Sequence, residues 1–401
     1  MDKRSKKLIQ ALAAAGIMIT GSGLGNLLAD NVGAANKITI QASELAKMKN
    51  EVPKVLAKAK DDRFLRDEVR LDRIFPCPEI LAAVSEDLGV GPASGITQQE
   101  LDRVIHLSVR EASDFEGLQF LRNLEAIHFR NVIHHELHLD GFDELKSLEV
   151  IGGNLQEIRL TNLSRLVLAE VSGNQLSGVF LENLPLLQTL DFSSNFLTRL
   201  ELPPLGGLRS LNLNHNQLRR LDIHGQDSLS NINLGYNQLL TASFKELPKL
   251  AHLNLTRNRL YDLELEQLPS LTNLYLGVNQ LTDLDFLKSL PKLNILNLYL
   301  NFVSDLSPAA SASHIMAADQ NIYLGQVEVG TKFPLNLFNA KNQVPELAYV
   351  SGGVLIAYDR DEGVFAIGVT PGEKTITFED DAFFGTLTFE ITEATAGEVA
   401  A

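Results

Sequence analysis

Cysteine is nearly absent from this chain of 401 residues, in which Cys77 is the only one. An intrachain disulfide is therefore excluded, and an exported protein of this sequence must be stabilised by burial of apolar side chains alone. Positive charge is also scarce, because 35 Lys and Arg stand against 50 Asp and Glu and leave a formal charge of −15. This acidic balance argues against a nucleic acid as the natural partner.

Long apolar runs are absent after the first 35 residues, so no transmembrane segment is expected in the rest of the chain. Within those residues, four basic residues precede the uncharged stretch 8–29, and small residues follow up to Ala34. This order is typical of a secretory signal, so we expect a signal peptide over 1–34 that is cleaved after Ala34. The alternative is a retained membrane anchor, because 22 uncharged residues are long enough to cross a bilayer, although four glycines and an asparagine dilute them.

Residues 35–73 are rich in Lys, Glu, Asp and Ala, with Pro53 as the only proline. This composition favours a charged, helical spacer.

The strongest pattern is an internal repeat with the frame L-x-x-L-x-L-x-x-N-x-L-x-x-L-x-L. Its Asn slot recurs every 21 residues, with a last step of 22. The nine slots are Val132, Gly153, Asn174, Asn195, Asn216, Asn237, Asn258, Asn279 and Asn301. The unit resembles a leucine-rich repeat, and we expect about nine such repeats over residues 112–310.

The spacing within each unit predicts its local structure. The L-x-L before the slot has period two, which places both leucines on one face of a short strand, and stacked units then form a parallel sheet. The slot Asn is expected to pair backbone groups that would otherwise be buried without partners. A unit of 21 residues leaves no room for a long outer helix, so the fold class is a leucine-rich-repeat solenoid with little helix.

Three short motifs precede the ladder: residues 74–76 read I-F-P, residues 97–101 read T-Q-Q-E-L and residues 117–124 read G-L-Q-F-L-R-N-L. With these motifs, the segment resembles the amino-terminal cap of the internalin family of Gram-positive bacteria. The resemblance implies an α-helical N-terminal cap over 74–111 and a C-terminal all-β, Ig-like β-sandwich domain over 314–394, followed by a tail at 395–401. The family's L-P-x-T-G sorting motif is missing, which points to the secreted, unanchored members.

In such a solenoid the concave strand face is the expected binding surface, because its side chains vary on a rigid backbone. We predict Tyr236, Tyr275 and Tyr299 as anchor residues for a protein partner. Further residues of this row are Asn254 and Asn297, and the carboxylates Glu149, Glu170 and Asp191, which would steer a basic partner. The alternative is that the tyrosines are ordinary exposed side chains and that stacked asparagines only bond along the sheet.

No catalytic or metal-binding pattern is recognisable. The segment His134–His138 misses the H-E-x-x-H signature, because Leu139 stands where the second histidine is needed. Residues 359–363 lack the ligands of a calcium loop and favour a hairpin turn. Cys77 lies between two prolines without an evident base. We therefore expect no enzyme, no cofactor and no metal.

The sequence as a whole predicts a secreted, monomeric, internalin-like protein that binds a host or neighbouring-cell surface protein, in an adhesion or virulence type role. The alternative is an envelope structural or interaction protein that its N-terminal segment retains at the bacterial cell.

Overall fold

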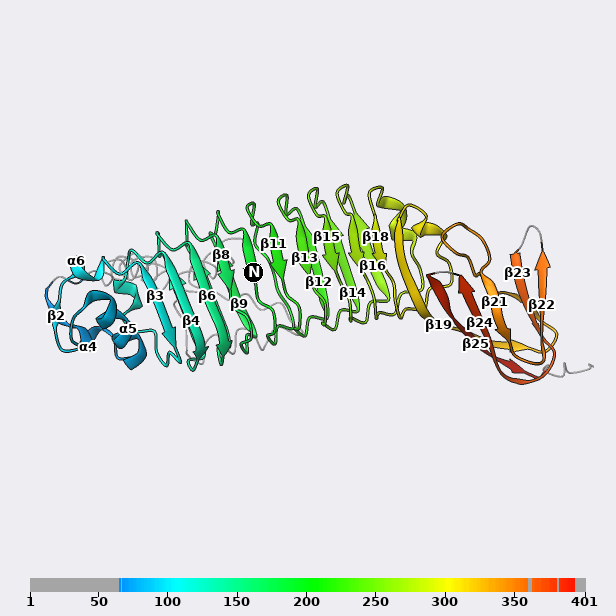
Figure 1. Ribbon diagram of the computed structural model, residues 1–401, viewed down its shortest axis with the longest axis horizontal. Coiled ribbons are helices and arrows are strands. Elements are labelled where there is room, and N and C mark those ends of the chain that lie inside the picture. Colours follow the sequence, from blue (N-terminus) through cyan, green and yellow to red (C-terminus); the bar gives the residue numbers. More distant parts are fainter. Residues whose placement is uncertain (1–64, 66, 360–362, 381, 394–401) are drawn as a thin grey trace, which may run out of the picture.

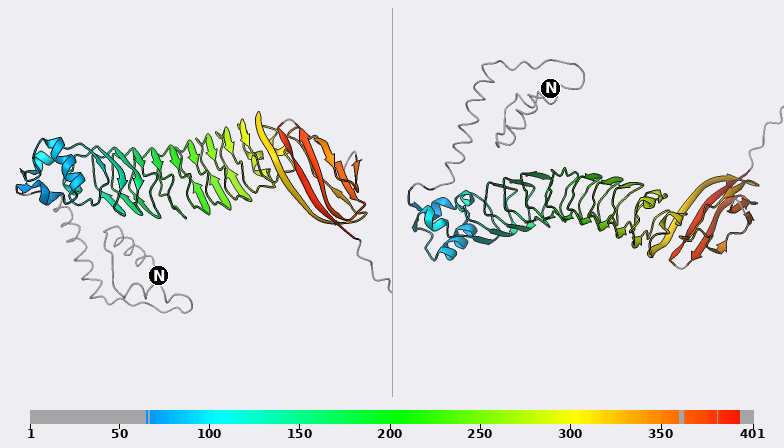
Figure 2. Two further views of the ribbon diagram at one scale, coloured as in Figure 1. Left: turned by 60° about the horizontal axis from the view of Figure 1, so that its bottom comes forward. Right: turned by 90° about the horizontal axis from the view of Figure 1, so that it is seen from above.

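The computed structural model describes residues 65, 67–359, 363–380 and 382–393 (Figure 1). The predicted signal peptide, most of the predicted spacer, the centre of the predicted turn at 359–363 and the predicted tail lie outside these residues. The described chain is elongated and gently curved, with helices at one end, stacked coils in the middle and a β-rich unit at the other end (Figures 1 and 2).

Short helices cover the first coil. The elements here are β1 (Val69–Arg70), α4 (Leu71–Ile74), α5 (Pro78–Leu88), β2 (Gly95–Ile96) and α6 (Gln98–Leu101). Helix α5 starts with a proline and ends at Gly89, which has a left-handed φ of 64°. Helix α6 starts with a capping box, in which the Thr97 backbone N–H donates to Glu100 and lowers the pKa of that carboxyl. Because α5 packs against the first solenoid strand, Leu107 of that strand is buried.

One parallel sheet runs the length of the solenoid. Its strands are β3 (His106–Arg110), β4 (Ala126–Val132), β6 (Ser147–Gly153), β8 (Leu168–Glu170), β10 (Thr189–Asp191), β11 (Ser210–Asn212), β13 (Asn231–Asn233), β15 (His252–Asn254), β17 (Asn273–Tyr275) and β18 (Ile295–Asn297). Equivalent residues pair across neighbours, as Leu190 does with Leu211, and the 22-residue step brings Leu274 beside Leu296. The predicted repeat and its phase, and with them the solenoid, are confirmed.

The opposite side of the solenoid carries two short parallel sheets in place of helices. One contains β5 (Glu136–Asp140), β7 (Glu157–Thr161) and β9 (Gly178–Glu182), and the other β12 (Arg220–His224), β14 (Thr241–Lys245) and β16 (Asp262–Glu266). The sheets are separated at Pro203 and Pro204, which have no N–H to donate. The Gln226 side chain bonds to backbone groups at this interruption: it accepts from Leu205 N (3.1 Å) and donates to Pro203 O (3.2 Å).

Three 3-10 helices complete the solenoid's loops. They are η1 (Leu118–Phe120), η2 (Asp285–Ser289) and η3 (Ser307–Ala309).

The long sheet continues without a break into the C-terminal unit. Strand β19 (His314–Glu328) pairs first with β18 and then with β25 (Phe383–Thr392). Strand β25 pairs in turn with β24 (Gly372–Asp380), and β24 pairs with the edge strand β21 (Glu346–Val350). A second sheet contains β20 (Lys332–Pro334), β23 (Gly363–Gly368) and β22 (Val354–Asp359). The two sheets pack face to face, as the rings of Phe333 and Phe389 show with centroids 5.0 Å apart. One connected apolar core therefore extends from the helices to this unit.

Candidate protein-interaction surface

The outward side of the long sheet, here called the strand face, is shaped by a corner that recurs in every repeat. Each three-residue strand is followed by a residue with a left-handed backbone immediately before the Asn slot. This corner row comprises Ser194, His215, Tyr236, Arg257, Val278 and Leu300, with φ between 52° and 60°. A left-handed residue turns the chain sharply, so the slot side chain enters the core while the corner side chain stays at the edge of the strand face.

The slot asparagines fill a buried polar ladder. In a representative member, Asn195 Nδ2 donates to Val171 O of the preceding repeat (2.8 Å) and to Phe192 O of its own (3.1 Å). Asn195 Oδ1 accepts from Leu176 N (2.9 Å). Bonds of this kind to preceding repeats recur along the ladder, whose members are at most 8% exposed: Asn174, Asn195, Asn216, Asn237, Asn258, Asn279 and Asn301. The ladder holds the corners, and so the strand face, in one geometry.

The ladder ends differently on its two sides. The first two slots hold Val132 and Gly153, which pair with each other at the ends of the seven-residue strands β4 and β6, although Asn131 and Gly152 before them keep the left-handed corner. Among the described residues, Asn174 Oδ1 is one of two buried side-chain atoms without a partner. At the far side Gln320 takes the slot role, accepting from Val303 N (3.0 Å) and donating to Leu298 O (2.9 Å). Gln320 was not predicted from the sequence, because it does not follow the preceding slot by 21 residues.

The three predicted steering carboxylates lie side by side on β6, β8 and β10, where Glu149 pairs with Glu170 and Glu170 with Asp191. Each is half-buried and bonded to neighbours. Glu149 lies 3.2 Å from His128 Nδ1, and Glu170 accepts from Ser172 Oγ (3.1 Å). Asp191 accepts from Ser193 N (2.8 Å) and Asn212 Nδ2 (2.7 Å). The three carboxylates therefore form a negatively charged, locally ordered row across β6, β8 and β10.

The predicted row asparagines have their carbonyl oxygens occupied. Asn254 Oδ1 accepts from Thr256 N (2.9 Å), and Asn297 Oδ1 accepts from Tyr299 N (3.0 Å). These bonds brace the turn after each strand. The side-chain amide Nδ2 groups of Asn254 and Asn297 are therefore the donors that a partner could use.

Tyr236 is held in a stack of three corner residues. Its ring lies on the imidazole of His215 with centroids 4.2 Å apart and planes 11° from parallel. In the next repeat, the guanidinium carbon of Arg257 lies 5.3 Å from the Tyr236 centroid. The residue is nevertheless 48% exposed, so the stack orients an aromatic side chain and leaves part of it accessible. His215 and Arg257 were not predicted from the sequence, although their spacing of 21 residues on either side of Tyr236 was an available signal.

The structure places Tyr275 and Tyr299 on adjacent strands. Tyr275 ends β17 and pairs with Asn297 of β18, two residues before Tyr299, so both rings rise from the same part of the strand face. Tyr299 is 40% exposed, and Tyr275 is half-buried. Met316 continues this row on β19 with 46% exposure and was not named from the sequence. Tyr236 lies two strands away from Tyr275 in the same sheet.

The remaining candidate chemistry is dispersed. His138 Nε2 lies 3.6 Å from Glu157 Oε1, while Leu137 and Leu139 beside it are buried. Cys77 is buried and its Sγ donates to Glu79 Oε2 (3.1 Å). In the part of the chain that the structure describes, no three His, Cys, Asp or Glu side chains gather to hold a metal ion.

Comparison with known families agrees with this geometry. The family of leucine-rich repeats (two copies) matches residues 269–311, which include β17 and β18. Residues 269–311 are thus similar to leucine-rich repeats. No curated protein sequence matches the chain. Within the described residues, no helix has the length and apolar character needed to cross a membrane.

Solved structures similar to this chain include several from Listeria monocytogenes. The functional domain of InlJ is 17% identical with a TM-score of 0.28, and the match covers 81% of this chain and 99% of that one. An internalin C2 is 23% identical with a TM-score of 0.34, over 63% and 98%. A secreted internalin-like protein is 14% identical with a TM-score of 0.32, over 82% and 100%. The internalin C2 and the internalin-like protein bear the name of the family that the sequence resembles.

Proposed function

We propose that this protein is secreted and binds a protein on the surface of a host or neighbouring cell through its strand face, in an adhesion or virulence type role. The observation that carries the proposal is the exposed Tyr236 ring, held between His215 and Arg257 on a rigid sheet. An oriented aromatic ring loses little side-chain entropy on binding, and tyrosine is enriched among the residues that dominate interface energies.

The strand face offers two chemically different halves. The half around Tyr236, Tyr275 and Tyr299 supplies contact area, and the half with Glu149 and Glu170 supplies negative charge. A partner with a basic edge would be steered by the acidic half and anchored by the tyrosines. We propose the tyrosines as anchor residues and the ladder asparagines as the groups that keep them in register.

Both ends of the solenoid support this role. We propose that the helices at 74–111 form a cap and that the C-terminal unit is an Ig-like domain. Each covers an open end of the apolar core, as repeat proteins require for solubility. Secretion is supported by the signal-like pattern of residues 1–34.

The proposal is tested by binding of the purified protein, labelled with a fluorophore, to intact cells measured by flow cytometry. The test variant is Tyr275→Ala with Tyr299→Ala, which removes two rings from the strand face. The matched control is Tyr261→Ala with Tyr358→Ala, since these tyrosines are 59% and 73% exposed and lie off the strand face.

We expect the strand-face variant to lose ~2–4 kcal/mol of binding free energy, as for two interface anchors, and the control to bind like the parent. The melting temperature should stay near that of the parent in both. Equal binding by the parent and the strand-face variant would contradict the anchor assignment. An intact Met1 in the bacterial membrane fraction, found by mass spectrometry, would contradict secretion.

A further inference from the structure

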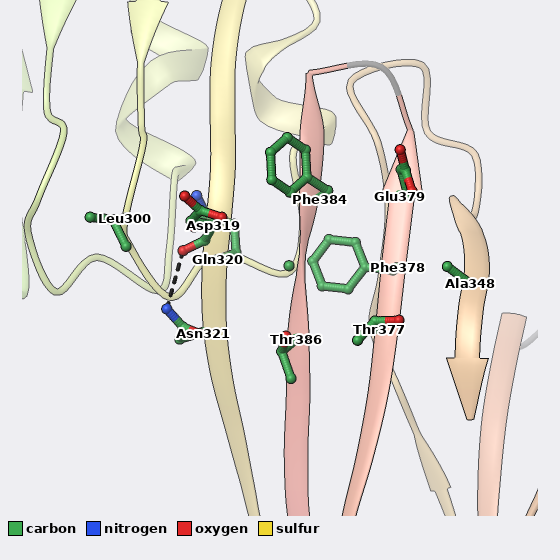
Figure 3. Close-up of a pocket in the computed structure, with 11 residues that line it drawn as sticks. Leu300, Asp319, Gln320, Asn321, Ala348, Thr377, Phe378, Glu379, Phe384 and Thr386 are labelled. Atoms are coloured by element: carbon green, nitrogen blue, oxygen red, sulfur yellow. Dashed lines mark hydrogen bonds between the residues drawn. The ribbon is translucent and has the colours of Figure 1, made fainter. Parts of the chain in front are cut away.

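A hollow of about 360 Å³ lies where the last coil meets the C-terminal sheet, with Leu300 of the corner row among its lining residues (Figure 3). Its wall contains Asp319 and Asn321 of β19, Phe384 and Thr386 of β25, and Thr377 and Glu379 of β24. These side chains lie on the outer side of the sheet, because the residues that alternate with them, such as Phe383 and Leu387, are buried. The hollow is therefore open to a partner.

Strand register places an aromatic ring between two carboxylates. Phe384 pairs with Glu379 on one side, and on the other it stands opposite the bulge that contains Asp319. Figure 3 shows the Phe384 ring between these two side chains. Since neighbouring strands are ~4.8 Å apart, the backbones of Asp319 and Glu379 are separated by ~10 Å, with the ring in the gap. Phe384 is 37% exposed, so part of its ring is accessible.

The charge of this hollow has one sign. Glu346 of β21 pairs directly with Glu379, which puts two exposed like charges opposite each other in an antiparallel pair. Such a pair is unfavourable unless a cation lies nearby. In the described part of the chain, none of the recorded ion pairs joins Asp319, Glu346 or Glu379 to a basic residue.

We propose that this hollow binds the guanidinium group of an arginine side chain of a protein partner. A guanidinium is planar and stacks on an aromatic ring such as Phe384, while its N–H groups spread in the plane and donate to carboxylates on either side. The hydroxyls of Thr377 and Thr386 supply further acceptors. A neutral or anionic group would leave the carboxylates uncompensated. This site uses none of the strand-face tyrosines, so it stands independently of the proposed function.

The site is tested on the full chain with the probe N-acetyl-arginine amide, titrated at low salt and followed by backbone-amide NMR shifts. N-acetyl-citrulline amide is the matched neutral probe, because it has nearly the same shape without the charge. We expect saturable shifts centred on Thr377, Phe384 and Thr386, and about tenfold weaker binding of the citrulline probe.

The test variant is Asp319→Asn with Glu379→Gln. Asparagine accepts the left-handed backbone of Asp319, whose φ is 56°, so the bulge is retained. The matched control is Glu246→Gln with Asp262→Asn, which removes the same charge from the opposite side of the solenoid and includes a left-handed residue, Glu246. We expect about tenfold weaker arginine binding in the test variant and unchanged binding in the control.

Phe384→Leu separates the effect of stacking from that of apolar burial, because leucine is apolar but has no π face. We expect this variant to bind the arginine probe several-fold more weakly. Equal binding of the arginine and citrulline probes would overturn the proposal. So would unchanged binding by the test variant, shifts centred outside the hollow, or tighter binding of N-acetyl-lysine amide. No cell-surface partner enters this experiment, so its failure is distinguishable from failure of the proposed function.

Discussion

Replacement of Asn237 by alanine tests how the ladder stabilises the solenoid. Asn237 Oδ1 accepts from Leu218 N (3.0 Å), and Nδ2 donates to Leu213 O (2.9 Å) and Leu234 O (3.1 Å). Both carbonyls keep a second bond, from Asn216 and from the ladder residue of the following repeat. The Leu218 N–H has no other recorded partner. Because one buried donor is orphaned, we expect a loss of ~1–3 kcal/mol in unfolding free energy.

The measurement is the urea midpoint and slope for Asn237→Ala beside those of the parent. Asn231→Ala is the matched control, because Asn231 lies in the same repeat but is exposed and should change stability by less than ~0.5 kcal/mol. Equal midpoints for the two variants would refute the idea that the slot side chain pairs buried backbone groups.

A second substitution at this slot, Asn237→Asp, gives a pH-dependent result. The introduced carboxylate faces the Leu213 and Leu234 carbonyl oxygens, which disfavour its charge and raise its folded-state pKa above the unfolded value. The unfolding free energy of the variant is therefore retained below the pKa that the introduced carboxyl has in the unfolded chain, and part of it is lost as pH rises through the pKa of that carboxyl in the folded protein. Denaturation midpoints that stay constant relative to the parent between acidic and neutral pH would contradict this account.

Three further outcomes are expected. Gly385→Val should destabilise the β19–β25 junction by ~1–3 kcal/mol in thermal unfolding, because a Cβ there would lie 2.2 Å from Gln320 O. Gln320→Ala should cost ~1–3 kcal/mol in urea unfolding, since it orphans the buried Val303 N–H. Lys245→Gln should raise the pKa of Glu264 in an NMR titration, because the Lys245 bond lowers that pKa. The bond's contribution is present above the unfolded pKa of Glu264 and lost as pH falls through the folded one, so this acid dependence should shrink in the variant.

The long sheet was predictable because its signal is periodic. Leu190, Leu211 and their equivalents recur at one spacing, and a chain that repeats its apolar residues at one spacing buries them by stacking. The outer sheets follow the second L-x-L of each unit. The interruption of those sheets was not predicted. It depends on Pro203 and Pro204, which lack an N–H, standing where a strand residue would donate to its neighbour.

The candidate surface was predictable only in part. The sequence identified Tyr275 and Tyr299 as members of the strand row and Tyr236 as a residue beside it, and in the structure Tyr236 belongs to the corner row. It did not reveal that His215 and Arg257 stack on Tyr236, because the corner position looks like a loop in the sequence. Nothing in the periodic pattern pointed to the hollow beside Phe384.

The sequence by itself determined what is local and repeated: the coil length, the inward leucines and the buried polar slot, since each depends on residues a few positions apart. The tertiary structure alone decided what joins distant segments. Asp319 and Glu379 meet across Phe384 only because β19 leaves the solenoid and adds β25 and β24 to the same sheet. Such a neighbourhood depends on strand pairing between segments more than 50 residues apart, and no spacing rule in the chain encodes it.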